Sequence, residues 1–264
     1  MTGAGGKLGR LLRAAWVERP VAGLRPIWAG RGEGHDIQWD MLSGSVPELP
    51  PSATVLHLAG VVRGSEGQLA ENSAMLPALV QASRAVRRVL FVSTAAVYRP
   101  GPLADEGDAP APPNPYGRAK LLAEEALRAQ GLCPVTVLRL GNVAGADALL
   151  GPRGADQIVL DPVPGRAGGP VRSWIGPKTL AHVLGALTMA ADLPDVVNVA
   201  CTPPLPMADL LEAAGLPWRY GPETPAVTAE ASLSIRRLAS LVALPQADAA
   251  TLTDEAAWAR GILA

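Results

Sequence analysis

Apolar runs rich in β-branched residues alternate along the chain with stretches in which apolar residues recur at helical spacing. The runs that predict strands are residues 26–29, 54–59, 89–93, 135–140 and 196–200. Continuous apolar strands are typical of parallel sheets because helices cover both faces of such a sheet. The alternation therefore predicts an α/β fold with three layers, a doubly wound parallel sheet of Rossmann type.

The helices follow from apolar positions at a period of 3.6 residues. The predicted faces are Leu8, Leu11, Leu12, Ala15 and Trp16 in the first helix, Met75, Leu76, Leu79 and Val80 in a second, and Leu121, Leu122, Glu125 and Ala126 in a third. Beyond about residue 222, a small helical cap is predicted by Leu238, Leu241 and Val242 and then by Ala257, Trp258 and Ile262.

Composition narrows the class of protein. A net charge of -1 with 48% hydrophobic residues allows a full core and argues against a nucleic-acid partner or a polybasic membrane contact. No apolar run approaches the ~20 residues of a spanning helix. Cys133 and Cys201 lie far apart and outside any cluster of metal-ligand type, so we expect two buried thiols, no metal and a cytoplasmic location.

Gly3, Gly6 and Gly9 form a GxxGxxG pattern directly before the helix that begins near Leu8. Glycines at a junction between strand and helix let the backbone approach a pyrophosphate at the helix N-terminus. With 28 glycines in the chain the spacing alone is weak evidence. Because only Met1 and Thr2 precede the pattern, the first strand is expected to be missing or truncated, or cofactor binding to be impaired.

Tyr116 and Lys120 are four residues apart at the start of a predicted helix, so their side chains share one face. A nearby ammonium favours the phenolate and would lower the pKa of the tyrosine towards the range of a general acid/base. The same lysine can hold a ribose hydroxyl. The alternative is an exposed aromatic residue beside a solvated lysine, but so few tyrosines and lysines rarely give this spacing by chance.

Polar residues close two of the predicted strands. Ser93 and Thr94 follow the apolar run 89–92, at the edge where open α/β sheets bind ligands. The Thr94 hydroxyl there could bond a substrate oxygen or satisfy its own backbone. His57 ends another strand, where it is either a structural residue, a residue that lines the cofactor, or a chemically active one.

Taken together, these residues resemble the extended short-chain dehydrogenase/reductase family, in particular its NAD-dependent epimerase/dehydratase group. The similar segments follow in the family's order: the glycine loop at 2–9, Asp40-Met41 at the adenine contact, His57-Leu58-Ala59-Gly60 at the fourth strand, Asn72 within a helix, 92–98 with Thr94 in the catalytic Ser/Thr position, 115–120 at the catalytic helix and 138–143 near the nicotinamide. The likeness extends over roughly residues 1–200.

The resemblance implies an NAD(P)-dependent epimerase, dehydratase or reductase acting on a carbonyl or alcohol of a nucleotide sugar or related small molecule. It implies Thr94, Tyr116 and Lys120 as catalytic residues, and Thr94 and Asn142 as substrate contacts. The implied cofactor contacts are Gly3, Gly6, Lys7, Leu8, Gly9, Arg31, Asp40, Met41, Leu58, Ala59, Gly60, Tyr116, Lys120 and Val143. Relatives often form homodimers.

The expected division places an NAD(P)-binding domain at residues 1–165 and a smaller substrate-binding part, interleaved with the last strands, at 166–264. Three departures affect the substrate region: residues 174–179 lack the family's His-Val-Asp-Asp type sequence, Ala144 replaces a frequent aromatic residue, and the region is short. An alternative function therefore stays open, a noncatalytic dinucleotide-binding or regulatory protein of the same fold.

The choice between NAD and NADP depends on the end of the second strand, at residues 29–33. An acidic side chain there would bind the ribose diol, whereas an arginine favours a 2′-phosphate. Arg31 indicates NADP, although Glu33 is near enough to reverse the preference.

Overall fold

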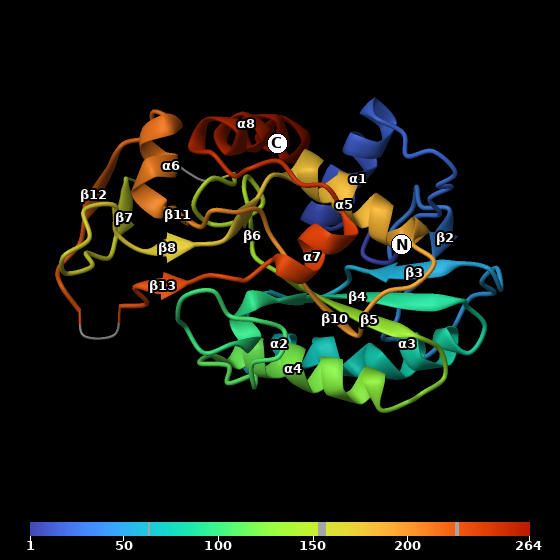
Figure 1. The fold of residues 1–264 in the computed structure, drawn as a ribbon. Helices are drawn as coiled ribbons and strands as arrows, with labels where there is room; N and C mark the ends of the chain where they lie inside the picture. The colour runs from blue at the N-terminus through green and yellow to red at the C-terminus, as the bar shows by residue number, and fades with distance from the viewer. Residues whose placement is uncertain (63, 153–156, 225–226) are drawn as a thin grey trace.

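A parallel sheet between two layers of helices forms the centre of the chain (Figure 1). This computed structural model describes residues 1–264 apart from 63, 153–156 and 225–226. Four hydrogen-bonded strands make up the middle of the sheet, in the spatial order β10 (Val196–Val199), β5 (Val135–Leu140), β4 (Arg88–Thr94) and β3 (Thr54–His57). All their pairings are parallel, which confirms the predicted three-layer α/β fold.

The sheet continues beyond β3 through a single residue. Thr2 forms parallel bridges to His57 on one side and to Ala29 on the other. Ala29 begins β1 (Ala29–Gly30), which pairs in parallel with β2 (Ile37–Gln38). The start of the chain thus lies between β1 and β3, the position that a doubly wound sheet gives to its first strand.

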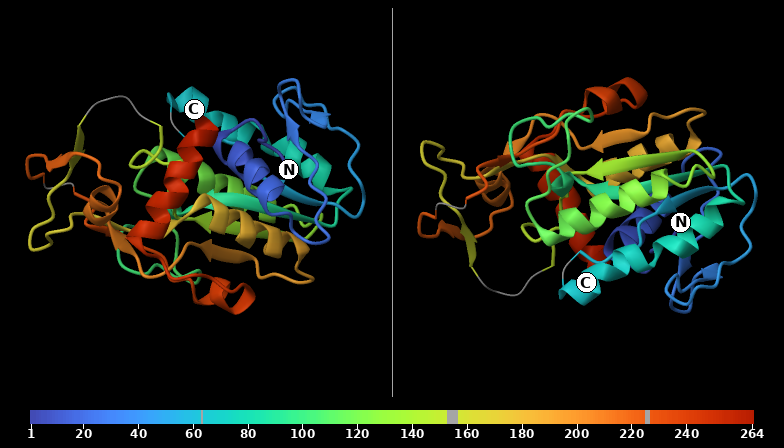
Figure 2. Two further views of the ribbon diagram at one scale, coloured as in Figure 1. Left: turned by 90° about the horizontal axis from the view of Figure 1, so that it is seen from above. Right: turned by 90° about the horizontal axis from the view of Figure 1, so that it is seen from below.

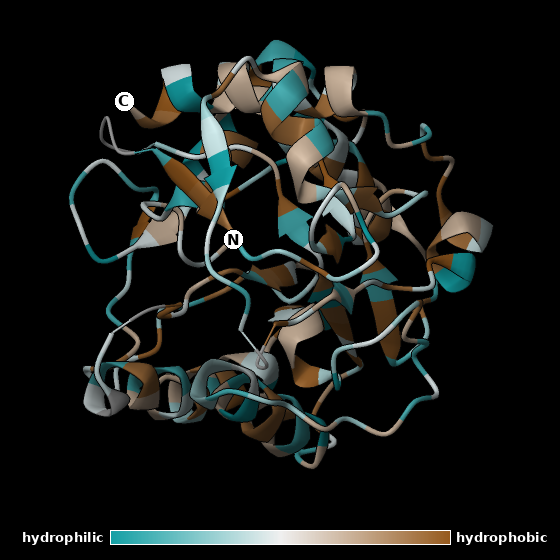
Figure 3. Cartoon of the chain, turned by 90° about the vertical axis from the view of Figure 1, so that its left-hand side faces the viewer, coloured by the Kyte–Doolittle hydropathy of each residue, from teal (hydrophilic) through white to brown (hydrophobic). Residues whose placement is uncertain are grey.

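Each face of the sheet is covered by helices (Figures 1 and 2). One layer contains α1 (Lys7–Glu18), α5 (Pro177–Met189) and α8 (Ala249–Leu263), and the other contains α2 (Glu66–Ala74), α3 (Leu76–Ser83) and α4 (Pro115–Arg128). The buried residues form two hydrophobic clusters, one under each layer. Helices in both layers alternate between hydrophobic and hydrophilic residues, as expected for surface helices (Figure 3).

Short strands build a side lobe at the left of Figure 1. Its parts are the parallel pair β7 (Ile158–Leu160) and β12 (Trp218–Tyr220), the sheet of β11 (Leu205–Pro206), β8 (Val171–Arg172) and β13 (Glu230–Ala231), and α6 (Met207–Ala213). The pair β6 (Asn142–Val143) and β9 (Trp174–Ile175) and helix α7 (Arg236–Leu241) join the lobe to the sheet. No helix in the described part of the chain is both long and apolar enough to cross a membrane.

The buried face of α4 differs from the predicted one. The helix buries Gly117, Lys120, Ala123, Glu124 and Leu127. Of the expected face, Leu121 is partly buried against the core, but the prediction is wrong for Leu122, Glu125 and Ala126, which are exposed. Leu122 is 59% exposed. The reason is that the buried face contains Lys120 and Glu124. Glu124 is held there by Arg139 and Ser93, which lie outside the helix, so the periodicity of the helix alone does not show this face.

The predicted face of α8 is wrong at Ala257, whereas Trp258 is partly buried and packs against the core as predicted. Leu252, Ala256 and Ala259 are buried, whereas Ala257 is exposed. A Cβ placed on Gly145 would lie 2.7 Å from the Cβ of Ala259 and 2.8 Å from the Cα of Ala256. The helix thus packs through small residues directly against a backbone turn, and small residues add little to a hydrophobic pattern.

The two cysteines are free and differ in burial. Cys201 is buried in the core, but Cys133 is only half-buried, so the expectation of two buried thiols is wrong for Cys133. Cys133 lies in the connection between α4 and β5, at the end of the sheet where solvent reaches the chain.

Enlarging the contact between α8 and Gly145 should destabilise the fold. We expect Ala259→Leu to lower the free energy of unfolding by about 1–3 kcal/mol, because no space exists for the added atoms. Ala257→Leu, the matched change on the exposed face, should alter it by less than about 0.5 kcal/mol. Urea denaturation measures both, and equal effects of the two changes would contradict the assignment of the buried face.

Candidate active site

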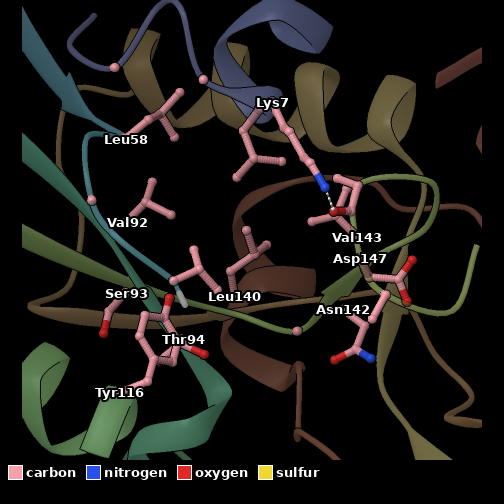
Figure 4. Close-up of a pocket in the computed structure, with 18 of the residues that line it drawn as sticks. Lys7, Leu58, Val92, Ser93, Thr94, Tyr116, Leu140, Asn142, Val143 and Asp147 are labelled. Atoms are coloured by element: carbon pink, nitrogen blue, oxygen red, sulfur yellow. Dashed lines mark hydrogen bonds between the residues drawn. The ribbon is translucent and has the colours of Figure 1, made fainter. Parts of the chain in front are cut away.

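A cavity of about 830 Å³ opens at the carboxyl ends of the central strands (Figure 4). Its lining comes from residues 3–9 around the start of α1, from the segments that follow β3 and β5, from the end of β4, from Asn72, from the start of α4, from the loop at 146–152 and from Met207. Ligands bind at this edge of open α/β sheets because the strands end there and the loops diverge.

Tyr116 is placed by a tightly docked helix N-terminus. Asn114 caps α4 by accepting a hydrogen bond from the Gly117 amide at 2.8 Å. The α-carbon of Gly117 lies so close to the Ala96 carbonyl that no side chain fits between them. Ala96 belongs to the short turn that directly follows Thr94, so this contact brings Tyr116 beside Thr94 (Figure 4).

The Thr94 hydroxyl satisfies its local backbone, which is one of the two alternatives that the sequence leaves open, and it also faces the cavity. Its oxygen accepts a hydrogen bond from the Ala96 amide at 3.2 Å, which satisfies the local backbone. The hydroxyl also bonds to the phenol of Tyr116 and lines the cavity. Thr94 therefore presents a hydroxyl at the place where Tyr116 would meet a substrate oxygen.

Burial controls the acidity of Tyr116. It raises the pKa of the phenol, while the bond to Thr94 acts in the opposite direction. The expected lowering of this pKa by Lys120 is therefore wrong for the protein without ligands. The physical reason is that removal of the phenolate from water outweighs the attraction of a lysine whose Nζ lies over the Phe91 ring, 4.2 Å from its centroid.

Lys120 is a cavity residue and not a solvated one. Its side chain is only 5% exposed, so the alternative of a lysine in bulk solvent does not hold. Burial lowers its pKa to about 8, and the carboxylate of Glu124 opposes that change. At neutral pH the lysine still carries its proton, so it presents a cation inside the cavity.

His57 is a satisfied core residue. It is 2% exposed, and its Nδ1 lies 2.8 Å from the Thr2 hydroxyl. The imidazole stacks on Phe91 with ring centroids 5.4 Å apart. Burial first, and then the charge of Lys120, lower its pKa to about 3. These contacts favour the structural role among those that the sequence allows.

The glycine loop is shaped by close approaches of the backbone. Gly3 has a φ of +73°, and a Cβ on it would lie 2.6 Å from the Ala59 amide nitrogen. A Cβ on Gly9 would lie 2.5 Å from the Ala4 carbonyl oxygen. The N-cap of α1 is Gly6, which has no side chain to cap the helix. This N-terminus lines the cavity and suits the pyrophosphate of a dinucleotide.

Most of the predicted site residues meet at this cavity. The lining includes Gly3, Gly6, Lys7, Leu8, Gly9, Leu58, Gly60, Thr94, Tyr116, Lys120, Asn142 and Val143. Arg31, Asp40, Met41 and Ala59 lie outside the lining. Arg31 and Asp40 are exposed, and Met41 packs into the hydrophobic core, so their contacts to a cofactor stay predictions.

The structure adds residues to the site beyond the contacts implied by the resemblance. Asp147 lies beside Asn142 on the wall opposite Tyr116 (Figure 4), and its carboxylate accepts hydrogen bonds from the amides of Leu149 and Leu150. Asn72 of α2 bonds through both ends of its amide to Val61 and fixes the loop after β3. Nothing in a local pattern distinguishes Asp147 from a loop residue, whereas the resemblance indicates Asn72 without giving it a role.

The lowered pKa of His57 makes the stability of the protein depend on pH. Between about pH 6.5 and pH 3 the unfolded chain binds a proton at this residue and the native protein does not. The free energy of unfolding should therefore fall as the pH is lowered through this window. We expect His57→Gln to flatten that slope in urea titrations, and His182→Gln, at an exposed histidine, to retain it. Parallel slopes for wild type and His57→Gln would contradict this account.

Comparison with known proteins identifies relatives of this chain. Residues 1–161 match the model of the NAD dependent epimerase/dehydratase family. A UDP-glucose 4-epimerase from Azospirillum brasilense is 32% identical over 174 residues, which are 56% of this chain and 49% of that protein. In this match the chain spans about half the length of its curated relative.

Solved structures share the fold over almost the whole chain. The UDP-glucose-4-epimerase from Stenotrophomonas maltophila, with bound NAD and formylated UDP-arabinopyranose, superposes with a TM-score of 0.75 at 17% identity and covers 99% of this chain and 97% of its own. The UDP-glucose 4-epimerase of Thermus thermophilus in complex with NAD gives a TM-score of 0.71 at 19% identity, with 98% of both chains covered. At these identities the likeness concerns the fold.

Proposed function

This chain belongs to the NAD dependent epimerase/dehydratase family, and from that premise we propose that it is an NAD(P)-dependent enzyme that interconverts an alcohol and a carbonyl on a nucleotide sugar. The observation that carries the proposal is the convergence of Thr94, Tyr116 and Lys120 on the cavity that also contains the glycine loop. A dinucleotide held at Gly3 and Gly9 would lie in the same cavity as these side chains.

The residues present fit a dinucleotide. The backbone at Gly3 and Gly9 leaves no room for side chains, and the uncapped N-terminus of α1 offers amide groups to a pyrophosphate. Lys120 would hold a ribose hydroxyl with its ammonium. When bound, the nicotinamide would supply the hydride acceptor and donor of the reaction.

Tyr116 would move the proton. Its phenol is protonated at neutral pH, as an ordinary tyrosine is, and burial raises its pKa further, so it is ready to donate to a carbonyl oxygen. The Thr94 hydroxyl, at the last residue of β4 and beside Tyr116, would orient that oxygen. In the reverse direction the same phenol oxygen receives the proton of the substrate alcohol.

The substrate would lie between Tyr116 and the opposite wall. Asn142 and Asp147 present polar groups there (Figure 4), and Met207 brings the side lobe to the cavity. We infer that residues 166–264 supply the substrate-binding part, since this segment forms much of the lobe but also contributes α5 and β10 to the central fold. Some of the structural relatives were solved with UDP sugars, among them the Stenotrophomonas maltophila enzyme, which supports the same class of substrate.

A panel of UDP sugars tests the reaction type. Turnover without net change in cofactor would support an epimerase, because the hydride returns to the sugar, whereas steady consumption of NAD(P)H with a carbonyl compound would support a reductase. Dinucleotide binding without any turnover would favour the noncatalytic alternative.

Replacing the proposed proton donor gives a direct test. We expect Tyr116→Phe to lower kcat by roughly 10²–10⁴-fold, the usual contribution of a general acid/base, with nearly unchanged affinity for the dinucleotide. Tyr220→Phe, which removes a phenol hydroxyl in the side lobe, should retain turnover. Steady-state kinetics and fluorescence titration with NADH or NADPH measure the two quantities. Full activity of Tyr116→Phe would remove Tyr116 from the mechanism.

We further propose a preference for NADP. Arg31 directly follows β1, at the strand end that faces the adenosine ribose in this fold. The His35 ring lies between this strand end and the glycine loop, with atoms 2.5 Å and 3.4 Å from Cβ positions built on Gly30 and Gly5. Its Nδ1 is buried without a hydrogen-bond partner among the described residues. A 2′-phosphate there would give both side chains an anionic partner.

Two titrations test this preference. We expect NADPH to bind more tightly than NADH, and Arg31→Ala to reduce NADPH affinity by roughly tenfold while NADH affinity changes little, since a charge-assisted hydrogen bond is lost. Arg25→Ala, at an exposed arginine before β1, serves as the control. Equal losses for both dinucleotides would overturn the proposed role of Arg31, and tighter binding of NADH would overturn the preference.

A further inference from the structure

Three buried polar residues behind the cavity, Ser93, Glu124 and Arg139, are linked by hydrogen bonds. The Ser93 hydroxyl donates a hydrogen bond to the carboxylate of Glu124. The guanidinium of Arg139 donates to the same carboxylate, with its Nη2 at 2.8 Å and its Nε at 3.2 Å. The side chains of Glu124 and Arg139 are only 2% and 5% exposed.

This carboxylate lies one helical turn after Lys120, on the same buried face of α4. Groups on three elements act on Lys120: His57 on β3, the Phe91 ring on β4, and Glu124 on α4 itself. Tyr116 lines the same cavity. His57 and Tyr116 are neutral at neutral pH because burial disfavours their charged forms. Arg139 of β5 meets Glu124 in turn. Of these groups, only Glu124 is an anion.

We infer that Glu124 is a positioning residue, whose carboxylate gives Lys120 a buried anion one turn away on the same face of α4 and holds the Ser93 hydroxyl in the wall, so that of the two hydroxyls at the end of β4 only that of Thr94 is offered to the substrate oxygen. Ser93 and Thr94 are neighbours at the end of β4, and both line the cavity. Because the Ser93 proton is bound to Glu124, only the Thr94 hydroxyl is free to bond to Tyr116.

The effect of Glu124 on the charge of Lys120 follows from the surroundings of the lysine. Burial alone pushes its pKa down, and Glu124 is the group that pushes it up. Arg139 supplies the opposite charge, without which the buried carboxylate of Glu124 would destabilise the folded protein. Neutralising Glu124 should therefore let the lysine lose its proton at a lower pH.

The test is a direct titration of Lys120 in the full chain. The protein contains three lysines, so labelling their ε-carbons with ¹³C gives three signals, and that of Lys120 is identified from Lys120→Met. We expect Glu124→Gln to lower the titration midpoint of Lys120 by about one pH unit. Glu125→Gln makes the same chemical change on the exposed face of α4 and should leave the midpoint unchanged. An unchanged midpoint in folded Glu124→Gln would overturn the inference.

Glu124→Gln leaves Arg139 buried without its anion, which can unfold the protein. The double variant Glu124→Gln/Arg139→Gln removes both charges together and serves as the second measurement. A lowered midpoint in this variant supports the inference, because the lysine has lost its anion in a folded protein. A midpoint equal to that of wild type would overturn it.

The inference rests on the proposed function in one respect only, the expected effect of Glu124 on dinucleotide binding. Lys120 would bind ribose as an ammonium, so the loss of dinucleotide affinity at alkaline pH should begin at a lower pH in Glu124→Gln than in Glu125→Gln. A shifted lysine titration without any dinucleotide binding would leave the role of Glu124 intact and refute the proposed function. An unshifted titration of Lys120 together with normal turnover would refute the role of Glu124 and leave the proposed function intact.

Discussion

The ion pair between Glu124 and Arg139 is the constraint from which the geometry of the cavity follows. It joins α4 to β5, and through Ser93 it also joins both to β4. A carboxylate and a guanidinium removed from water are tolerated only in contact, so the pair sets the rotation of α4 against the sheet. That rotation directs Tyr116 and Lys120 to the strand ends and leaves Leu122 in solvent.

The same pair is connected to the neighbouring strand β10. The guanidinium of Arg139 lies over the Tyr98 ring, 4.7 Å from its centroid, and the Tyr98 hydroxyl donates to the side-chain oxygen of Asn198 at 2.9 Å. The backbone N–H of Asn198 in turn donates to the carboxylate of Glu106 at 2.8 Å. A continuous polar path thus runs through the interior from the cavity wall to β10. Each member is satisfied by its neighbours, as buried polar groups require.

The sequence was sufficient for the strands of the central sheet and for most residues that line the cavity, because both depend on local order. Apolar runs mark buried strands. The spacing of four residues puts Tyr116 and Lys120 on one helix face, whichever way that helix is rotated. The most deeply buried residues of α4 and α8 could not be predicted in this way. Glu124 is buried by a partner distant in sequence, and Ala259 packs because it is small. The acidity of Tyr116 depends on its depth in the folded protein, which spacing alone does not give. The side lobe contains strands too short to produce a period.

The buried pair also has a consequence for the history of the sequence. A lineage that replaces Glu124 first is left with an unmatched guanidinium in the interior, and one that replaces Arg139 first is left with an unmatched carboxylate. Either single step leads through a poorly folded ancestor, although the two changes together can be nearly neutral. The two positions are therefore held by sign epistasis, so among descendants they are expected to persist as a pair or to be exchanged as a pair.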